Sequence, residues 1–271
     1  MGKFTGVLLV VDYDDTFYDH SLSVSQENRR AVARFIDQGG LFSVATGRAY
    51  INFAFQMATE DLPINAPVIL SNGAGIHDFS TGETLWEMDL PLEVPDHLNA
   101  VCEAFPEVAF EAYHGDHVYV YRANTVTERH MFWCNLDGIP KPIEEIPVPW
   151  LKVILQHEEL GYLEKVQAFI KTRWPGEYEV TFSNAVQLEL TAKGANTGLA
   201  VQRLARHLGI QPEHIYCAGN GVNDIPMLEV SAIPFAPADC YPQVRETEPV
   251  LLPACDDNAL ARLIEILDER Y

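Results

Sequence analysis

The sequence FTGVLLVV at residues 4–11 is an almost continuous apolar run, and DYDDTF at residues 12–17 follows it directly. Such a run is typical of a strand that is buried on both faces of a parallel sheet. Residues 25–38 then predict a helix, because Ser25 is a suitable N-cap and apolar side chains recur at helical spacing. A second apolar run at residues 41–46 predicts the next strand, so the chain begins with the strand–helix–strand order of an α/β fold.

The pattern changes after a third predicted strand at residues 66–72. Residues 83–189 contain short alternating strand-like segments, one or two helices near residues 93–104 and 158–173, and a proline-rich connector, and we interpret them as an inserted α/β domain. A further amphipathic helix at residues 198–210 marks the return of the first pattern. The predicted fold is therefore α/β, with a Rossmann-like, doubly wound parallel sheet formed by residues 1–82 and 190–271 around the inserted domain.

The composition indicates a folded protein that does not bind polyanions. Apolar residues make up 48% of the 271 residues, and 39 acidic residues against 18 basic ones give a formal net charge of −21. This charge repels nucleic acids and anionic membranes, so we expect neither as a partner. The five cysteines are widely spaced without a CxxC pair, which argues against a disulfide framework and a structural zinc site. With no signal peptide evident, we expect a cytoplasmic protein.

Polar side chains follow the predicted strands at the points where these strands end. In an open α/β sheet the ligand binds beyond the carboxyl ends of the strands, so these positions are the candidate site. The candidates are Asp12, Asp14 and Thr16 after the first strand, Thr46, Gly47 and Arg48 after the second, Ser71 and Asn72 after the third, and Gly219 to Asp224 after a later one.

Asp12 and Asp14 are two positions apart on an extended segment, so their carboxylates project to the same side and repel each other. A divalent cation relieves this repulsion, and oxygen ligands without nearby His or Cys favour Mg²⁺. Asp224 and the amide oxygens of Asn220 or Asn223 are the further candidate ligands. The pattern therefore predicts a magnesium site.

The same residues suit phosphoryl transfer. A carboxylate such as Asp12 can act as a covalent nucleophile, and Asp14 can protonate the leaving oxygen and then activate water. Thr46 and the backbone amides of Gly47 and Arg48, which we expect to open a helix, would bind phosphate oxygens. A capping role for the acids, a surface ion pair for Arg48 and a simple turn at Asn72 are the structural alternatives for these residues.

Together these segments resemble the haloacid dehalogenase superfamily, and within it the Cof-like sugar-phosphate phosphatases with an α/β cap of type IIB. The resemblance covers nearly the whole chain. It rests on DYDDT (12–16), SVATGR (43–48), SNGAGIHD (71–78), PWLKVIL (149–155), QLELTAKG (187–194) and GNGVNDIPML (219–228). It implies that Asp12 is the nucleophile and Asp14 the acid/base, that residues 83–189 form a cap, and that the substrate is a sugar phosphate. Thr16, Asn72 and Asn223 complete the expected substrate-binding set.

The sequence departs from this family's pattern at two positions. Asn220 stands where the family usually has an acidic metal ligand, and Thr197 stands where the family usually has a lysine. Lys193, four residues earlier, is our candidate for the catalytic lysine, and an ordinary loop lysine is the alternative.

We therefore expect a Mg²⁺-dependent phosphatase of a small phosphorylated metabolite that works through an aspartyl phosphate, as a monomer or a homodimer. Two alternatives follow from the same residues. A catalytically weak protein that binds a phosphorylated ligand would explain both departures, and a phosphomutase would share the aspartyl phosphate and differ in the acceptor.

Overall fold

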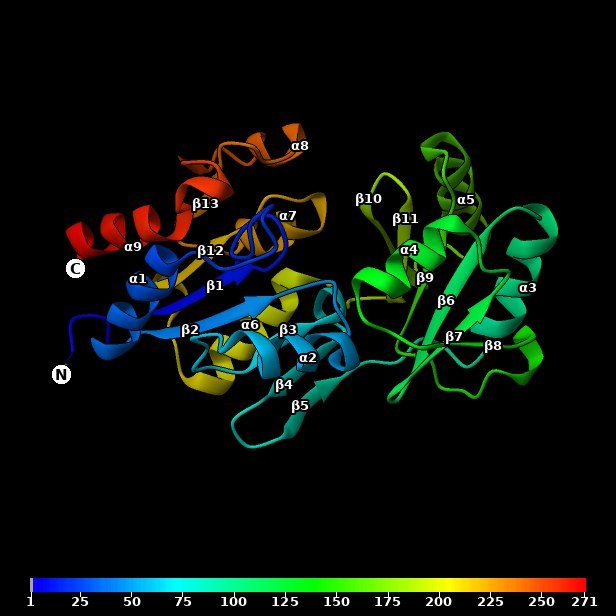
Figure 1. The fold of residues 1–271 in the computed structure, drawn as a ribbon, viewed down its shortest axis with the longest axis horizontal. Helices are drawn as coiled ribbons and strands as arrows, with labels where there is room; N and C mark the ends of the chain where they lie inside the picture. Colours follow the sequence, from blue (N-terminus) through cyan, green and yellow to red (C-terminus); the bar gives the residue numbers. More distant parts are fainter. Residues whose placement is uncertain (1) are drawn as a thin grey trace. The chain divides into compact units, whose positions relative to one another are not determined.

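The computed structural model describes residues 2–271, which form two compact units. The first unit comprises residues 2–47, 55–86 and 196–271, and the second comprises residues 48–54 and 87–195. Each unit has its own sheet and its own hydrophobic core (Figure 1). None of the helices within the described part of the chain is long and apolar enough to cross a bilayer.

The sheet of the first unit has eight strands in the order β14-β13-β12-β1-β2-β3-β4-β5. The six strands from β14 to β3 pair in parallel, and β4 pairs antiparallel with β3. The strands are β1 (Leu8–Asp12), β2 (Leu41–Ala45), β3 (Val68–Leu70), β4 (Gly75–Asp78), β5 (Glu83–Glu87), β12 (Ile215–Ala218), β13 (Pro234–Pro237) and β14 (Val250–Leu252). This arrangement confirms the predicted parallel α/β class.

β1 lies between β2 and β12, and all five of its residues are buried. It begins at Leu8, later than the apolar run at residue 4 suggested, because residues 3–6 form a turn in which Gly6 has a φ of +86°. The Phe4 amide instead donates to the carbonyl of Gln38, 2.9 Å away. Parallel pairing on both sides brings the carboxyl ends of β1, β2 and β12 to the same edge of the sheet.

Helices accompany this parallel sheet. Ser25 caps α1 as predicted, because its hydroxyl accepts from the Asn28 amide (3.1 Å), and α6 ends at Gly209 in the left-handed conformation. The Asn28 side chain in turn accepts from the Ala261 amide of α9 (3.0 Å). The helices are α1 (Gln26–Asp37), α2 (Tyr50–Glu60), α6 (Thr197–Leu208), α7 (Ile225–Glu229), α8 (Pro242–Arg245) and α9 (Ala259–Arg270).

The second unit contains a six-stranded sheet in the order β10-β11-β9-β6-β7-β8, antiparallel except for the β7–β8 pair. Apolar residues of α3 and α5 share a core with Trp150 and one set of sheet side chains. The elements are α3 (Val94–Ala104), β6 (Ala109–His114), β7 (His117–Tyr121), α4 (Thr125–Trp133), β8 (Gly138–Pro140), β9 (Lys152–Gln156), α5 (Leu160–Arg173), β10 (Tyr178–Asn184) and β11 (Gln187–Ala192). The inserted segment is thus an α/β unit.

Candidate active site

Asp12 is the last residue of β1, where its backbone lies opposite Ala45 of β2. The side chain is 6% exposed. Burial raises the pKa of this carboxyl well above its usual value, and the nearby charges of Asp224 and Asp14 add to the shift. Hydrogen bonds from the Tyr13 amide and the Thr16 hydroxyl act in the opposite direction. Two buried carboxyl groups, Asp12 and Asp224, and the half-buried Asp14 therefore lie together in an electrostatically unfavourable arrangement.

The loop after β1 holds Asp14 and Thr16 beside this carboxyl. The Phe17 and Tyr18 amides both donate to the Tyr13 carbonyl (3.1 and 2.7 Å), which folds the chain back on itself. Asp14 is half-buried, and the fully buried Thr16 hydroxyl lies within hydrogen-bonding distance of Asn220 Oδ1 (3.4 Å). This contact joins the loop after β1 to the loop after β12.

Asp224 is 1% exposed and comes from that second loop. Its Oδ2 accepts from the Gly221 amide (2.8 Å), whereas its Oδ1 is buried without a hydrogen-bond partner among residues 2–271. Burial raises the pKa of Asp224 to about 7. A Cβ added at Gly219 would lie 2.5 Å from the Asp224 Cβ, so glycine is required for this close approach.

The loop that follows β3 meets the same region of the first unit. Asn72 adopts a φ of +54°, and its Oδ1 accepts from Asn223 Nδ2 (3.3 Å). Thr197, the first residue of α6, donates from its hydroxyl to the Asn223 carbonyl (2.9 Å). The residue at the family's lysine position therefore anchors the Asp224 loop. We did not predict this role from the sequence, although the cap-like order Asn196-Thr197 was a signal of the helix start.

The residues after β2 are placed differently from the prediction. Thr46 is buried, its amide donates to the Ile69 carbonyl (2.9 Å), and its carbonyl accepts from the Asn72 amide (3.0 Å). Because α2 begins at Tyr50, Gly47 and Arg48 precede the helix and do not open it, which corrects our expectation. Arg48 belongs to the second unit and Gly47 to the first.

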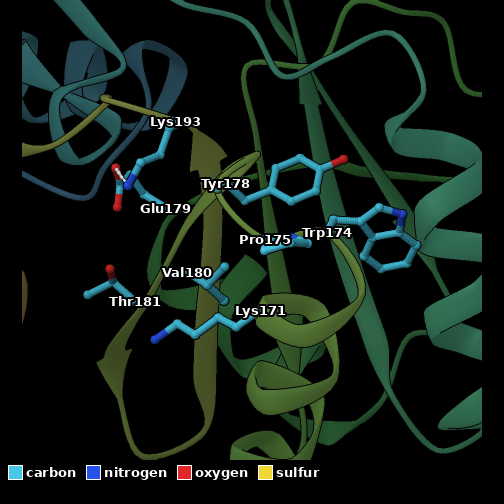
Figure 2. Close-up of a pocket in the computed structure, with 9 residues that line it drawn as sticks. Lys171, Trp174, Pro175, Tyr178, Glu179, Val180, Thr181 and Lys193 are labelled. Atoms are coloured by element: carbon cyan, nitrogen blue, oxygen red, sulfur yellow. Dashed lines mark ion pairs between the residues drawn. The ribbon is translucent and has the colours of Figure 1, made fainter.

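Lys193 belongs to the second unit, at the end of β11. Its ammonium forms an ion pair with Glu179 Oε1 (2.9 Å), and the side chain is 58% exposed. The same carboxylate oxygen accepts from the Gly194 amide (3.0 Å). Figure 2 shows Lys193 beside Glu179 at a pocket of about 370 Å³ that Trp174 and Tyr178 also line. This lysine has a carboxylate partner within its own unit.

The first-unit residues fit a divalent cation. Asp12, Asp14, Asn220 and Asp224 offer oxygen donors, which Mg²⁺ prefers. The buried Asp224 Oδ1 has no donor among the described residues, and burial raises the pKa values of Asp12 and Asp224, with neighbouring carboxylates adding to the shift at Asp12. A cation at this place would allow both carboxyls to ionise.

Known proteins resemble this chain over nearly its full length. The phosphatase of 5-amino-6-(5-phospho-D-ribitylamino)uracil named YwtE, from Bacillus subtilis, is 25% identical, with 96% of this chain and 97% of that protein covered. The HMP-PP phosphatase of Yersinia enterocolitica is 24% identical, with 95% and 94% covered.

Solved structures share the fold. The sugar phosphatase BT4131, of subclass IIB, superposes with a TM-score of 0.85 at 19% identity, covering 97% of this chain and 99% of its own. A haloacid dehalogenase-like hydrolase from Bacteroides thetaiotaomicron gives 0.83 at 21% identity, with 96% and 99% covered. The family model for haloacid dehalogenase-like hydrolases matches residues 9–264. This chain therefore belongs to the haloacid dehalogenase-like hydrolase family.

Proposed function

We propose that this chain, a phosphatase of the haloacid dehalogenase type, hydrolyses the monoester of a small phosphorylated metabolite with Mg²⁺ as cofactor. The observation that carries the proposal is the buried carboxyl group of Asp224 beside Asp12, with one oxygen lacking a partner in the described structure. This arrangement is unfavourable for folding alone, since burying carboxyls near one another costs free energy. It suits a site that binds a cation and a phosphate.

Asp12 is the proposed nucleophile. Its carboxylate oxygen attacks phosphorus while the bond to the leaving oxygen breaks, and Asp14 gives its proton to that oxygen. Asp14 then takes a proton from a water molecule, whose oxygen attacks the aspartyl phosphate and releases inorganic phosphate and the Asp12 carboxylate. Thr16, Thr46 and Gly47 are the proposed phosphate-binding groups, and Asn72 and Asn223 are the neighbours that position them.

Mg²⁺, held by Asp12, Asp14, Asn220 and Asp224, would neutralise charge on the phosphoryl group. Arg48 and Lys193 remain proposed contributors of positive charge to the substrate. Because Lys193 pairs with Glu179, its participation requires that this ion pair break.

We infer a phosphorylated sugar or sugar alcohol as the substrate class. The support comes from the similar proteins, since YwtE is a phosphatase of a phosphoribityl compound and BT4131, which shares the fold, is a sugar phosphatase. The cap role that we expect of residues 83–189 remains part of this proposal, and the second unit contains this segment from residue 87 onward.

The test is phosphate release from p-nitrophenyl phosphate and from a panel of hexose, pentose and ribityl phosphates, with Mg²⁺ and with EDTA. We expect turnover that requires Mg²⁺ and is lost in Asp12→Asn. The matched control is Asp37→Asn, which changes a carboxylate at the end of α1. Absence of turnover across the panel in the presence of Mg²⁺ would contradict the proposal.

A phospholigand-binding protein with weak catalysis is the second candidate. Two observations favour it: the residue at the family's lysine position is Thr197, whose hydroxyl bonds to Asn223, and the candidate replacement Lys193 is paired with Glu179. Calorimetry distinguishes the two, since tight binding of a sugar phosphate without turnover supports the binding protein. Analysis of the products would identify a phosphomutase, which transfers the phosphoryl group to a second hydroxyl of the sugar.

A further inference from the structure

A second group of potential metal ligands lies in the first unit, on residues that the proposed phosphatase chemistry does not use. His20 follows the Asp14 loop, Asp239 follows β13, and Cys255 follows β14. One ligand atom from each of these three residues lies within 4.8 Å of the others. His20 is more than two hundred residues from the other two along the chain, so the fold alone assembles them.

The separations of the donor atoms are close to those around a tetrahedral ion. Cys255 Sγ lies 3.4 Å from Asp239 Oδ2, and it lies 3.5 Å from His20 Nδ1 and 3.9 Å from His20 Nε2. Zn²⁺ bonds of roughly 2.0–2.3 Å at tetrahedral angles place neighbouring ligand atoms about 3.3–3.8 Å apart. A thiol hydrogen-bonded to Asp239 explains the shortest of these distances.

The orientation of His20 is the second, independent observation. Asp256 Oδ2 lies 3.0 Å from His20 Nδ1, and Asp256 Oδ1 accepts from the His20 backbone amide (3.0 Å). A carboxylate that accepts a hydrogen bond from Nδ1–H favours the tautomer in which Nε2 carries the lone pair, which is the usual arrangement around a metal-bound histidine. Asp239 is held in a similar way, because its Oδ1 accepts from the Cys255 amide (3.3 Å).

We propose that His20 Nε2, Cys255 Sγ and Asp239 bind a zinc ion, with a water molecule in the fourth tetrahedral position. Sulfur and imidazole donors select Zn²⁺ over Mg²⁺, so this site differs in chemistry from the oxygen site at Asp12 and Asp224. The ion would also offset the charge of three carboxylates gathered around one histidine. It would tie the loop after β1 to the loops after β13 and β14.

A cysteine binds zinc as the thiolate, so metal binding at Cys255 must displace the proton of the thiol. We therefore expect metal binding to release a proton. Calorimetry in two buffers of different ionisation enthalpy measures this release. The cysteine spacing could not reveal this site, since it contains one cysteine and draws its other ligands from distant segments.

The test is titration of the metal-free full chain with Co²⁺ in the presence of excess Mg²⁺, which protects the oxygen site. We expect one equivalent of Co²⁺ to produce a thiolate-to-cobalt charge-transfer band that Zn²⁺ abolishes. Cys255→Ser should lose the band, and Cys240→Ser, which changes the neighbouring buried thiol, should keep it. Asp256→Asn should weaken binding by about 10–100-fold, as is usual for the loss of a metal ligand's supporting carboxylate.

A band that survives in Cys255→Ser, or no band at one equivalent of Co²⁺, would overturn the proposal. Circular dichroism of the variants establishes that each retains the secondary structure of the parent chain. A further readout is the melting temperature, which Zn²⁺ should raise in the parent chain and in Cys240→Ser but not in Cys255→Ser.

Discussion

At the scale of single residues, Asp224 links the candidate site to the stability of the protein. Its folded-state pKa is about 7, against an ordinary value of 3.8, so between these pH values the folded chain holds a proton that the unfolded chain has lost. Metal-free protein should therefore lose stability as pH rises from about 4 to 7 and then level off, because stability falls with pH wherever the folded state binds more protons. The pKa of Asp12 is also raised in the folded chain, so Asp12 likewise lowers the stability of the metal-free protein as pH rises.

The measurement is urea unfolding in EDTA across this pH range, for the parent chain and for Asp224→Asn. We expect a shallower decline in the variant, which cannot ionise at this position. Added Mg²⁺ should restore the lost stability at pH 7 in the parent chain. Identical pH profiles for the two proteins would show that Asp224 is already ionised without metal.

Asn220 offers a second prediction at the residue scale. Asn220→Asp places a charged oxygen where the neutral amide now lies 3.4 Å from the Thr16 hydroxyl, and a carboxylate can accept the same hydrogen bond. We expect Mg²⁺ affinity to rise by about tenfold, equivalent to about 1.4 kcal/mol. In EDTA the same variant should be less stable, because a further negative charge joins Asp12 and Asp224.

Calorimetric titration with Mg²⁺ and unfolding in EDTA test the two halves of this prediction. Asn135→Asp, at a loop of the second unit, is the matched control and should change neither quantity. Unchanged or weaker Mg²⁺ binding in Asn220→Asp would indicate that residue 220 is not a metal ligand.

At the scale of elements, the start of α6 positions the loop that carries Asp224. The Thr197 hydroxyl donates to the Asn223 carbonyl, and Asn223 contacts Asn72 in turn. Thr197→Val keeps the shape and removes this buried hydrogen bond, so it should lower the free energy of unfolding by about 1–3 kcal/mol. It should also weaken Mg²⁺ binding, since the loop loses its anchor.

Thr197→Ser retains the hydroxyl and is the control for this element. Urea unfolding and Mg²⁺ titration of both variants give the comparison. Equal Mg²⁺ affinities in Thr197→Val and the parent chain would restrict Thr197 to a purely structural role.

At the scale of the whole molecule, the two units have separate cores, and the proposed magnesium ligands all belong to the first. Mg²⁺ at 100 times its dissociation constant should stabilise the folded chain by about 2.7 kcal/mol. Because local openings are governed by local contacts, Mg²⁺ alone should slow hydrogen exchange most in β1 and β12. Exchange of peptides from β6 and β9 of the second unit should change less.

Hydrogen exchange read by mass spectrometry, with and without Mg²⁺, tests this expectation, and Asp224→Asn should abolish the difference. Equal slowing in both units would instead mean that they open together as one cooperative body.

Much of the fold was predictable because it depends on neighbours in the sequence. The apolar run of β1, the Ser25 cap of α1 and the left-handed end of α6 at Gly209 follow from local periodicity and local backbone preference. The α4 helix was not predicted because it is only nine residues long and its apolar residues do not recur at helical spacing. The Asn124 side chain caps its first turn by accepting from the Val126 and Thr127 amides. An asparagine in a polar segment is equally typical of a turn, so this cap could not be recognised from the sequence.

Some features of the candidate site were likewise predictable from the sequence, whereas others depend on the tertiary structure. The sequence alone determined that acidic groups follow the apolar strands, and it identified the resemblance that the family match bears out. Only the tertiary structure decided that Asp224 lies beside Asp12, that Lys193 pairs with Glu179, and that His20 meets Cys255. Those contacts depend on strand order and on loops far apart in the chain, whereas local patterns extend over only a few residues.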